Sequence, residues 1–303
     1  MKRHKICKII FAILAVFLCV AFYELIGICI TYKKQPAVSD ATIKETQNIM
    51  SVAGRENTER AVIIEKNSQA LLERVRLIQN AKDEIILSTF AFKSDESGKL
   101  ILGALHDAAD RGVHVRILVD GMESWIDMEG NPYFYGLSSH ENVEIKLYNK
   151  ANPLKPWKTM GRMHDKYLIA DGKIYILGGR NTYNYFLGAF PGHKNFDRDV
   201  LVVCDEPQKD NSVNQLWNYF ETIWEQEDCR YFHNSKKLAD RQSVKKAVLE
   251  LQEGYQQYFE VNKEKICDTD YADETFETEK ITLLSNPIHT QAKEPVVWYQ
   301  LGE

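Results

Sequence analysis

The chain has 303 residues, of which 44% are hydrophobic and 27% are charged, and its formal net charge is −5. This composition is ordinary for a globular protein and excludes a disordered, collagen-like or multi-span membrane chain. Residues 1–34 carry a net charge of +5, so the remainder carries −10. Nucleic-acid binding depends on basic residues that neutralise the phosphates. The negative charge of this remainder therefore argues against a nucleic-acid-binding protein with an overall basic surface.

The N-terminal segment is predicted to anchor the chain in a membrane. Residues 9–32 are apolar apart from Glu24, and 24 residues can span a bilayer as a helix. A cleaved signal peptide is the main alternative, but no A-x-A-like site follows. A buried core helix fits less well, because the segment is apolar on every side. We therefore expect a basic tail at 1–8, an anchor at 9–32 and a polar linker at 33–60.

The charges that flank this segment predict its orientation. Four Lys or Arg residues precede it and two follow it. Cytoplasmic flanks carry the excess of positive charge, which predicts a single-pass cell-membrane protein with a cytoplasmic N-terminus and an extracytoplasmic body. The six cysteines show no C-x-x-C pair and no partner histidine at metal-ligand spacing. Neither a disulfide framework nor a metal site is expected, and no cofactor is predicted.

Strand and helix patterns alternate from about residue 61, which predicts an α/β sandwich with a mixed sheet. Two apolar runs flank Asp171-Gly172, and this dipeptide favours a two-residue hairpin turn. Ser68 is expected to cap the first helix, and 268–279 is an expected acidic loop. The predicted helices lie at 68–81, 97–111, 212–227 and 243–259. The predicted strands lie at 84–92, 113–119, 143–148 and 199–204, with two more on either side of the turn at 171–172 and the start of another at 281–284.

One constellation has the composition of a phosphate site with a nucleophile. Its spacing is H-x-K-x4-D-x6-G-G-x-N, formed by His164, Lys166, Asp171, Gly178, Gly179 and Asn181. Alternate residues of a strand share a face, so the side chains of His164 and Lys166 are expected to point the same way. Lysine supplies charge, asparagine supplies amide donors, and paired glycines allow close backbone approach. Neutral imidazole beside them is a competent nucleophile near pH 7.

The segment HDKYLIADGKIYILGGRN resembles the HKD motif of the phospholipase D superfamily. The strand–helix–strand segment that begins AKDEIILSTFAF, and the segments FDRDVLVV and LLSNPIHTQAKEPVVWYQL, are similar to bacterial cardiolipin synthase-type members. The resemblance covers about residues 61–303. It implies an α-β-α sandwich with a mixed sheet, preceded here by one transmembrane helix. It also implies an enzyme that transfers or hydrolyses phosphodiesters.

The resemblance also implies roles for individual residues. His164 would form a phosphohistidine, while Lys166 and Asn181, with Gly178 and Gly179, would hold the phosphate. Asp171 completes the motif, although an x-D-G-x hairpin turn would require it in any case, so turn former and direct site residue both stay open. Asp197 matches the acid that orients the histidine in relatives, and Asp199 is the fallback. A carboxylate in that place would hold the imidazole tautomer.

The local charge distribution agrees with a phosphate site. Residues 145–180 carry a net charge of +6 within a body of net −10. We therefore expect positive potential concentrated around the motif. The sequence leaves two roles open for Trp157, which lies in a proline-rich stretch: contact with a lipid interface, or ordinary packing.

The chain departs from the cardiolipin synthase pattern by containing one HKD motif. The family's mechanism uses two histidines, one to attack and one to protonate the leaving alcohol. Residues 61–265 are therefore expected to form a catalytic half and 266–303 a connector with the start of a second half. The chain is thus expected to be an N-terminal half, and a fragment, a truncated gene product and a protein that pairs with another chain all stay open. In the last case a homodimer or another chain would supply the missing half.

The leading interpretation is a membrane-anchored phosphatidyltransferase or phosphodiesterase acting on phosphatidylglycerol-type lipids through a phosphohistidine. Nucleic acid is a disfavoured partner. The alternatives are a dimeric single-motif phosphodiesterase or nuclease, and a catalytically incomplete half.

Overall fold

A computed structural model describes residues 2–33, 59–150 and 161–285, together with residues 40, 43, 44, 47, 152 and 154. Helix α1 (Lys2–Lys33) contains a 23-residue segment, Lys5–Gly27, that is long and apolar enough to cross a membrane. Its large hydrophobic side chains are exposed, which is the pattern of a helix meant for an apolar solvent. One N-terminal helix with the character of a membrane span is therefore present, as expected.

The rest of the described chain folds around a mixed nine-stranded sheet in the order β8-β4-β3-β2-β5-β6-β7-β1-β9. Strands β2, β3 and β4 are mutually parallel, and every other neighbouring pair is antiparallel. The strands are β1 (Arg60–Ile64), β2 (Glu84–Thr89), β3 (His114–Asp120), β4 (Val143–Tyr148), β5 (Lys166–Ala170), β6 (Ile174–Gly178), β7 (Asp199–Val203), β8 (Cys229–Tyr231) and β9 (Phe276–Glu277).

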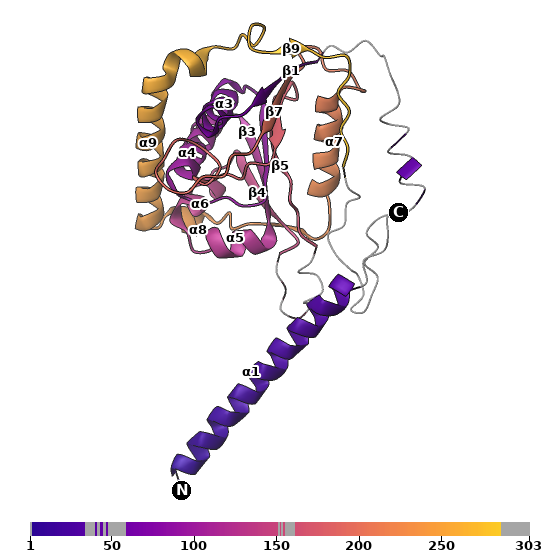
Figure 1. The fold of residues 1–303 in the computed structure, drawn as a ribbon. Helices are drawn as coiled ribbons and strands as arrows, with labels where there is room; N and C mark the ends of the chain where they lie inside the picture. The colour runs from indigo at the N-terminus through magenta and orange to yellow at the C-terminus, as the bar shows by residue number, and fades with distance from the viewer. Residues whose placement is uncertain are drawn as a thin grey trace.

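Helices cover both faces of this sheet, which confirms the predicted α-β-α sandwich (Figure 1). One face carries most of them and the other carries α7, which stands alone on its side of the sheet in Figure 1. The helices of the body are α3 (Asn67–Asn80), α4 (Glu96–Asp110), α5 (Gly121–Asp127), α6 (Pro132–Ser138), α7 (Ser212–Trp224), α8 (Lys236–Ala239) and α9 (Gln242–Cys267).

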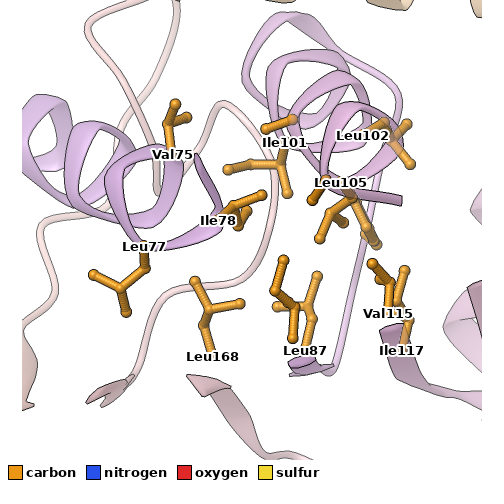
Figure 2. Close-up of a cluster of buried hydrophobic side chains, with 14 of the residues drawn as sticks. Val75, Leu77, Ile78, Leu87, Ile101, Leu102, Leu105, Val115, Ile117 and Leu168 are labelled. Carbon is orange, nitrogen blue, oxygen red and sulfur yellow. The ribbon is translucent and has the colours of Figure 1, made fainter. Parts of the chain in front are cut away.

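The central strands are buried on both faces, as strands of parallel character usually are. Leu87 and Ile117 point toward α3 and α4, where they meet the labelled side chains of both helices in Figure 2. Ile86 and Leu118 point the opposite way and join a second cluster under α7. Phe220 and Trp224 of α7 belong to that second cluster, so these aromatic side chains pack in the core.

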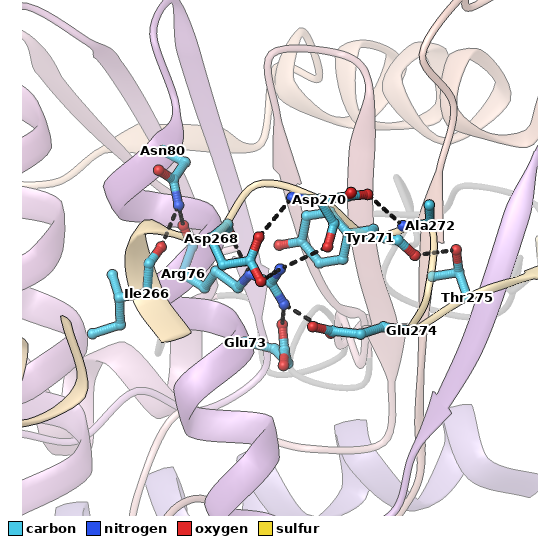
Figure 3. Close-up of polar contacts among 10 residues, drawn as sticks. All are labelled: Glu73, Arg76, Asn80, Ile266, Asp268, Asp270, Tyr271, Ala272, Glu274 and Thr275. Atoms are coloured by element: carbon cyan, nitrogen blue, oxygen red, sulfur yellow. Dashed lines mark hydrogen bonds and ion pairs between the residues drawn. The ribbon is translucent and has the colours of Figure 1, made fainter. Parts of the chain in front are cut away.

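The buried side chain of Arg76 binds the segment that follows α9 and keeps this segment against the body. Arg76 of α3 lies 3.9 Å from the centroid of the Tyr271 ring and pairs with Glu274 at 2.8 Å (Figure 3). It also donates to the carbonyl oxygen of Asp268 at 2.7 Å. Fixed in this way, the segment adds β9 to the edge of the sheet beside β1. The acidic stretch is thus attached to the body, and it is not the free solvated loop that its composition suggested.

Three local predictions differ from the structure. Helix α3 begins at Asn67 after Lys66, so Ser68 lies inside the helix and does not cap it. The hairpin at Asp171-Gly172 is present, but three residues connect its paired ends, Ala170 and Ile174. The segment 281–285 is not a strand, because Ile281 and Leu283 pack against the cluster under α7 instead of joining the sheet.

Leu105→Ala tests the core between the sheet and its larger helical layer. Leu105 is fully buried among side chains of α3, α4 and the central strands, so its truncation leaves a cavity. We expect the free energy of unfolding to fall by about 2–5 kcal/mol. Leu249→Ala, on α9 and 59% exposed, should cost less than about 0.5 kcal/mol. Urea denaturation of the full chain in detergent measures both, and equal losses would contradict this description of the core.

Candidate active site

The motif residues gather because strand ends meet at one edge of the sheet, which we call the catalytic edge. Strand β5 runs antiparallel to β2, so Lys166 at its start lies opposite Thr89 at the end of β2. Strand β6 ends at Gly178, which lies opposite Asp199 at the start of β7. The parallel strand β3 ends at this edge with Asp120. Residues from five segments of the chain are thereby brought together.

His164 is held beside Phe90, just beyond β2. The two ring centroids are 4.6 Å apart in an edge-to-face arrangement. Partial burial lowers the pKa of His164, and the charges of Lys166 and Arg162 lower it further, while Asp165 and Asp120 raise it. The imidazole is therefore neutral at pH 7. Among the described residues its ring nitrogens have no hydrogen-bond partner, which leaves a lone pair available for attack.

Lys166 and Asn181 flank the same strand end. The Lys166 ammonium donates to the His164 carbonyl at 2.6 Å, and its side chain is almost fully buried. Burial lowers the pKa of Lys166, while Asp165 and Asp197 raise it. The carboxamide oxygen of Asn181 accepts from the Ala91 N–H at 3.2 Å. That bond sets the amide orientation, so the NH₂ group is the part of Asn181 that a phosphate oxygen would meet.

The paired glycines make room for carboxylates. A Cβ atom at Gly178 would come within 2.1 Å of an Asp199 carboxylate oxygen, and one at Gly179 within 2.1 Å of an Asp197 oxygen. The Gly179 N–H is already used, because it donates to the Arg198 carbonyl at 3.3 Å. The glycines therefore permit the close approach of the chain that leads into β7, and direct phosphate binding by them stays a prediction.

The two candidate acids have different surroundings. Asp197 acts electrostatically on Lys166, and one of its oxygens accepts from the N–H of Arg198 at 2.8 Å. Asp199 is fully buried between Arg74 at 2.9 Å and Arg180 at 3.2 Å. Both arginines contact the same oxygen, Oδ2, and tie Asp199 to α3 and to the end of β6. The fallback assignment of Asp199 as the acid that orients His164 stays a prediction. The assignment of Asp197 stays a prediction.

Asp171 lies at the opposite end of β5 from His164. Its φ of 52° and the φ of 61° at Gly172 are the left-handed values that a tight hairpin turn requires. Its carboxylate accepts from the backbone N–H groups of Lys82, Asp83 and Glu84 at 2.8–3.0 Å. This geometry favours the turn-forming role over a direct role in the site, the two options that the sequence left open.

Asp120 is a site residue that the sequence did not single out. It is buried, it caps α5 through the N–H groups of Met122 and Glu123, and it accepts from the Met163 N–H at 3.1 Å. It also accepts from Arg162 at 2.9 Å. One carboxylate thus ties the end of β3 to the two residues before His164. The signal that could have identified Asp120 in the sequence was its position, because it is a carboxylate at the end of a buried strand.

The predicted basic patch does not assemble around the motif within the described residues. Lys146 is buried and donates to the Trp224 carbonyl at 2.9 Å, and Arg180 is buried with Asp199. Lys173 follows the turn at the far end of β5. Arg162 and Lys166 are the cations that reach His164. The hairpin carries Lys173 to the end of the strands opposite Lys166, whereas Lys146 and Arg180 are held by buried partners. Lys155, Trp157 and Lys158 lie outside the described residues.

The described residues contain no group of three or more His, Cys, Asp or Glu side chains placed to hold a metal ion. The chemistry that this arrangement supports is nucleophilic. A neutral imidazole sits beside one buried ammonium and one amide donor, the combination needed to attack a phosphorus atom and stabilise the charge on its oxygens.

The sequence of the chain is similar to those of known proteins. The family model described as "Cardiolipin synthase, PLD-like domain" matches residues 75–224. An uncharacterized protein of Helicobacter pylori strain 26695 is 30% identical over 179 residues, which are 55% of this chain and 35% of that protein. Cardiolipin synthase C of Escherichia coli K12 is 30% identical over 154 residues, 46% of this chain and 31% of that enzyme.

Among solved structures, NucT from Helicobacter pylori aligns with a TM-score of 0.45 and 17% identity, over 57% of this chain and 99% of that one. In the two curated relatives named above, the matched segments cover only about a third of the relative's length.

Lys166→Met tests the electrostatic state of the site. The Lys166 charge lowers the pKa of His164, so its removal should raise that pKa toward the ordinary value of about 6.5. Titration of isotopically labelled histidine by NMR measures the change. Lys173→Met removes the same charge at the other end of the hairpin and should leave the His164 titration unaltered. An unchanged or lower pKa in Lys166→Met would refute the proposed contact.

Asp171→Asn tests the turn-forming role. The substitution keeps tolerance of the left-handed backbone but removes the charge that accepts three N–H groups. We expect a loss of about 1–3 kcal/mol in the free energy of unfolding, measured in urea. The His164 titration should not move. Asp273→Asn, in an exposed turn, serves as the matched control and should cost little; a shifted His164 pKa in Asp171→Asn would instead place Asp171 in the site.

Proposed function

We propose, from the premise that this chain belongs to the phospholipase D superfamily, that it transfers or hydrolyses phosphodiesters of phosphatidylglycerol-type phospholipids through a phosphohistidine on His164. The observation that carries the proposal is the neutral His164 ring beside Lys166 and Asn181 at the catalytic edge. The family model matched and the relatives named cardiolipin synthase favour a phospholipid substrate.

The proposed reaction proceeds in two displacements. A ring nitrogen of His164 attacks the phosphorus, so that an N–P bond forms while the P–O bond to the leaving alcohol breaks. The alcohol takes a proton from a general acid. A second alcohol, or water, then loses its proton to that group and attacks the phosphohistidine, which restores the imidazole. Lys166 and the Asn181 amide stabilise the negative charge on the phosphate oxygens in both steps.

The general acid is proposed to be a second histidine from another copy of this chain or from a partner chain. The site geometry supports this, because no other histidine ring contacts His164 among the described residues. A site at the junction of two chains would also cover the catalytic edge on the side where His164 is exposed. We propose that residues 61–265 form the catalytic unit of such an assembly.

We propose further that α1 anchors this unit in the cell membrane, with the N-terminus cytoplasmic and the body extracytoplasmic. The apolar segment Lys5–Gly27 has the length of a single span. The excess of basic residues before it supports the orientation. A membrane tether also keeps the site near a phospholipid substrate, which a nuclease would not need, and the net charge of −10 outside residues 1–34 works against binding long nucleic acids.

His164→Ala tests the function. The purified full chain is incubated with phosphatidylglycerol carrying labelled phosphorus, quenched, and examined for acid-labile label on protein and for cardiolipin or phosphatidic acid. We expect both signals in the native chain and a loss of turnover of about 10³-fold or more in the variant, the magnitude typical of a missing nucleophile. His114→Ala removes an exposed histidine at the opposite edge of the sheet and should retain turnover.

Single-stranded DNA is offered in parallel. Cleavage of DNA without lipid turnover, abolished by His164→Ala, would overturn the lipid assignment while keeping the nucleophile. Full turnover in His164→Ala would overturn the mechanism itself.

A further inference from the structure

Three side chains form a second polar cluster where the chain continues beyond the catalytic edge. Lys93 lies in the segment after β2, Asp127 ends the helix α5 that follows β3, and Tyr183 lies two residues after Asn181. The Lys93 ammonium is 4.9 Å from the centroid of the Tyr183 ring and 3.6 Å from a carboxylate oxygen of Asp127. We call Lys93, Asp127 and Tyr183 the polar cluster. The displacements described above give it no task.

Backbone hydrogen bonds fix the polar cluster relative to the Asn181 amide. The Ala91 N–H donates to the Asn181 carboxamide oxygen, and the Thr182 N–H donates to the Ala91 carbonyl at 3.0 Å. The Lys93 N–H donates to the Thr182 carbonyl at 3.2 Å. The segments that carry Lys93 and Tyr183 are therefore paired with each other, and one of these bonds also orients Asn181.

One ion pair connects the polar cluster with the nucleophile. Glu123 of α5 pairs with Arg162 at 2.8 Å, and the charge of Arg162 acts on His164. The charge of Glu123 also acts on Asp127 and Tyr183. Charges act appreciably over about 10 Å or less. The polar cluster and the imidazole therefore lie on two sides of the same ion pair.

Two groups of the polar cluster have hydrogen-bonding capacity that the described residues leave unused. Oδ2 of Asp127 is buried and has no hydrogen-bond partner among them, and neither has the Tyr183 hydroxyl. By contrast, the neighbouring Asp95 accepts from the N–H groups of Gly98 at 3.1 Å and Asn184 at 2.8 Å. An unpaired buried carboxylate oxygen is costly, so a hydroxyl that donates to it gains more than it would at an exposed carboxylate.

The charges around the polar cluster select a neutral ligand. Two cations, Lys93 and Arg162, stand against the three carboxylates of Asp95, Glu123 and Asp127, which gives a net charge of −1. A second phosphate would be repelled by this charge, and an ammonium group would be repelled by the lysine. Hydroxyl groups meet neither obstacle. One can donate to the carboxylate while another accepts from the ammonium or from the tyrosine hydroxyl.

The polar cluster can be reached by a small ligand. The side chain of Lys93 is 41% exposed and that of Asp127 is 15% exposed. A subsite of this kind next to the nucleophile does not require an open edge, so it is compatible with a second chain that covers His164.

We propose that Lys93, Asp127 and Tyr183 form a subsite for a neutral polyol, the alcohol that leaves in the first displacement and the alcohol that enters in the second. In the second displacement a hydroxyl oxygen of the bound polyol forms a P–O bond while the N–P bond to His164 breaks, and the hydroxyl proton goes to the general acid–base group. In a phosphatidylglycerol-type substrate both alcohols carry glycerol hydroxyls, so each would use the subsite in turn. This inference rests on the proposed function.

Competition between alcohols tests the subsite. The full chain is supplied with phosphatidyl-p-nitrophenol, whose leaving group is not a polyol, and with glycerol and ethanol at equal concentrations. We expect the native chain to form phosphatidylglycerol at least tenfold faster than phosphatidylethanol. Tyr183→Phe and Asp127→Leu should each lower this preference about fivefold, the effect of one lost hydrogen bond, with the release of p-nitrophenol unchanged. Tyr231→Phe, which alters an exposed tyrosine on β8 that pairs with Glu144, should keep the preference.

Equal rates with the two alcohols, or an undiminished preference in both variants, would overturn the subsite while the release of p-nitrophenol still supports the proposed function. In a parallel reaction ethanolamine replaces ethanol, and a preference for ethanolamine over glycerol would overturn the polyol assignment in favour of an amine. If no p-nitrophenol is released, the proposed function fails and binding alone tests the subsite. With 3-fluorotyrosine in place of Tyr183 in the His164→Ala chain, the fluorine resonance should shift with glycerol and not with ethanol. An identical response to both alcohols overturns the subsite.

Discussion

The antiparallel placement of β5 beside β2 is the constraint on which the rest of the site depends. Strands β2, β3 and β4 are parallel and deliver their ends to one edge of the sheet. Because β5 runs the other way, its start lies at that same edge, and the register of Lys166 opposite Thr89 places His164 beside Phe90. A shift of one residue would turn Lys166 to the opposite face and Asp165 toward the site. The register is stabilised by burial on both faces, since Leu168 belongs to one core cluster and Ile169 to the other.

Buried charges around this edge serve different tasks, and their partners decide which. Asp199 is held between Arg74 and Arg180, so it stabilises the junction of α3, β6 and β7. Asp120 connects β3, α5 and the residues before His164, so it positions the segment that carries the nucleophile. Asp165 alternates with the two functional side chains and turns to Tyr219 under α7 at 2.9 Å. Asp120 and Asp165, the two carboxylates whose charges act on His164, are thus separated by the faces and strands to which they belong.

The catalytic edge must both shield His164 and admit a substrate. His164 needs partial burial to stay neutral, and it needs access to a phosphorus atom. Under the proposed function, a second chain at this edge would complete the desolvation of His164 and supply the general acid.

The sequence by itself determined the features that depend on local order and periodicity. The length and apolarity of α1, the helical spacing of α7 and the motif from His164 to Asn181 were all evident without a structure, because each is a property of one continuous segment. Only the tertiary structure decided that Asp171 lies at the far end of β5, that two arginines enclose Asp199, and that Asp120 and Phe90 hold the segment of the nucleophile. Within the described residues the hairpin likewise separates Lys173 from Lys166 by the length of the strands, while residues distant in sequence meet where strand ends converge. Strand order and register set those distances, and neither is encoded in a single segment.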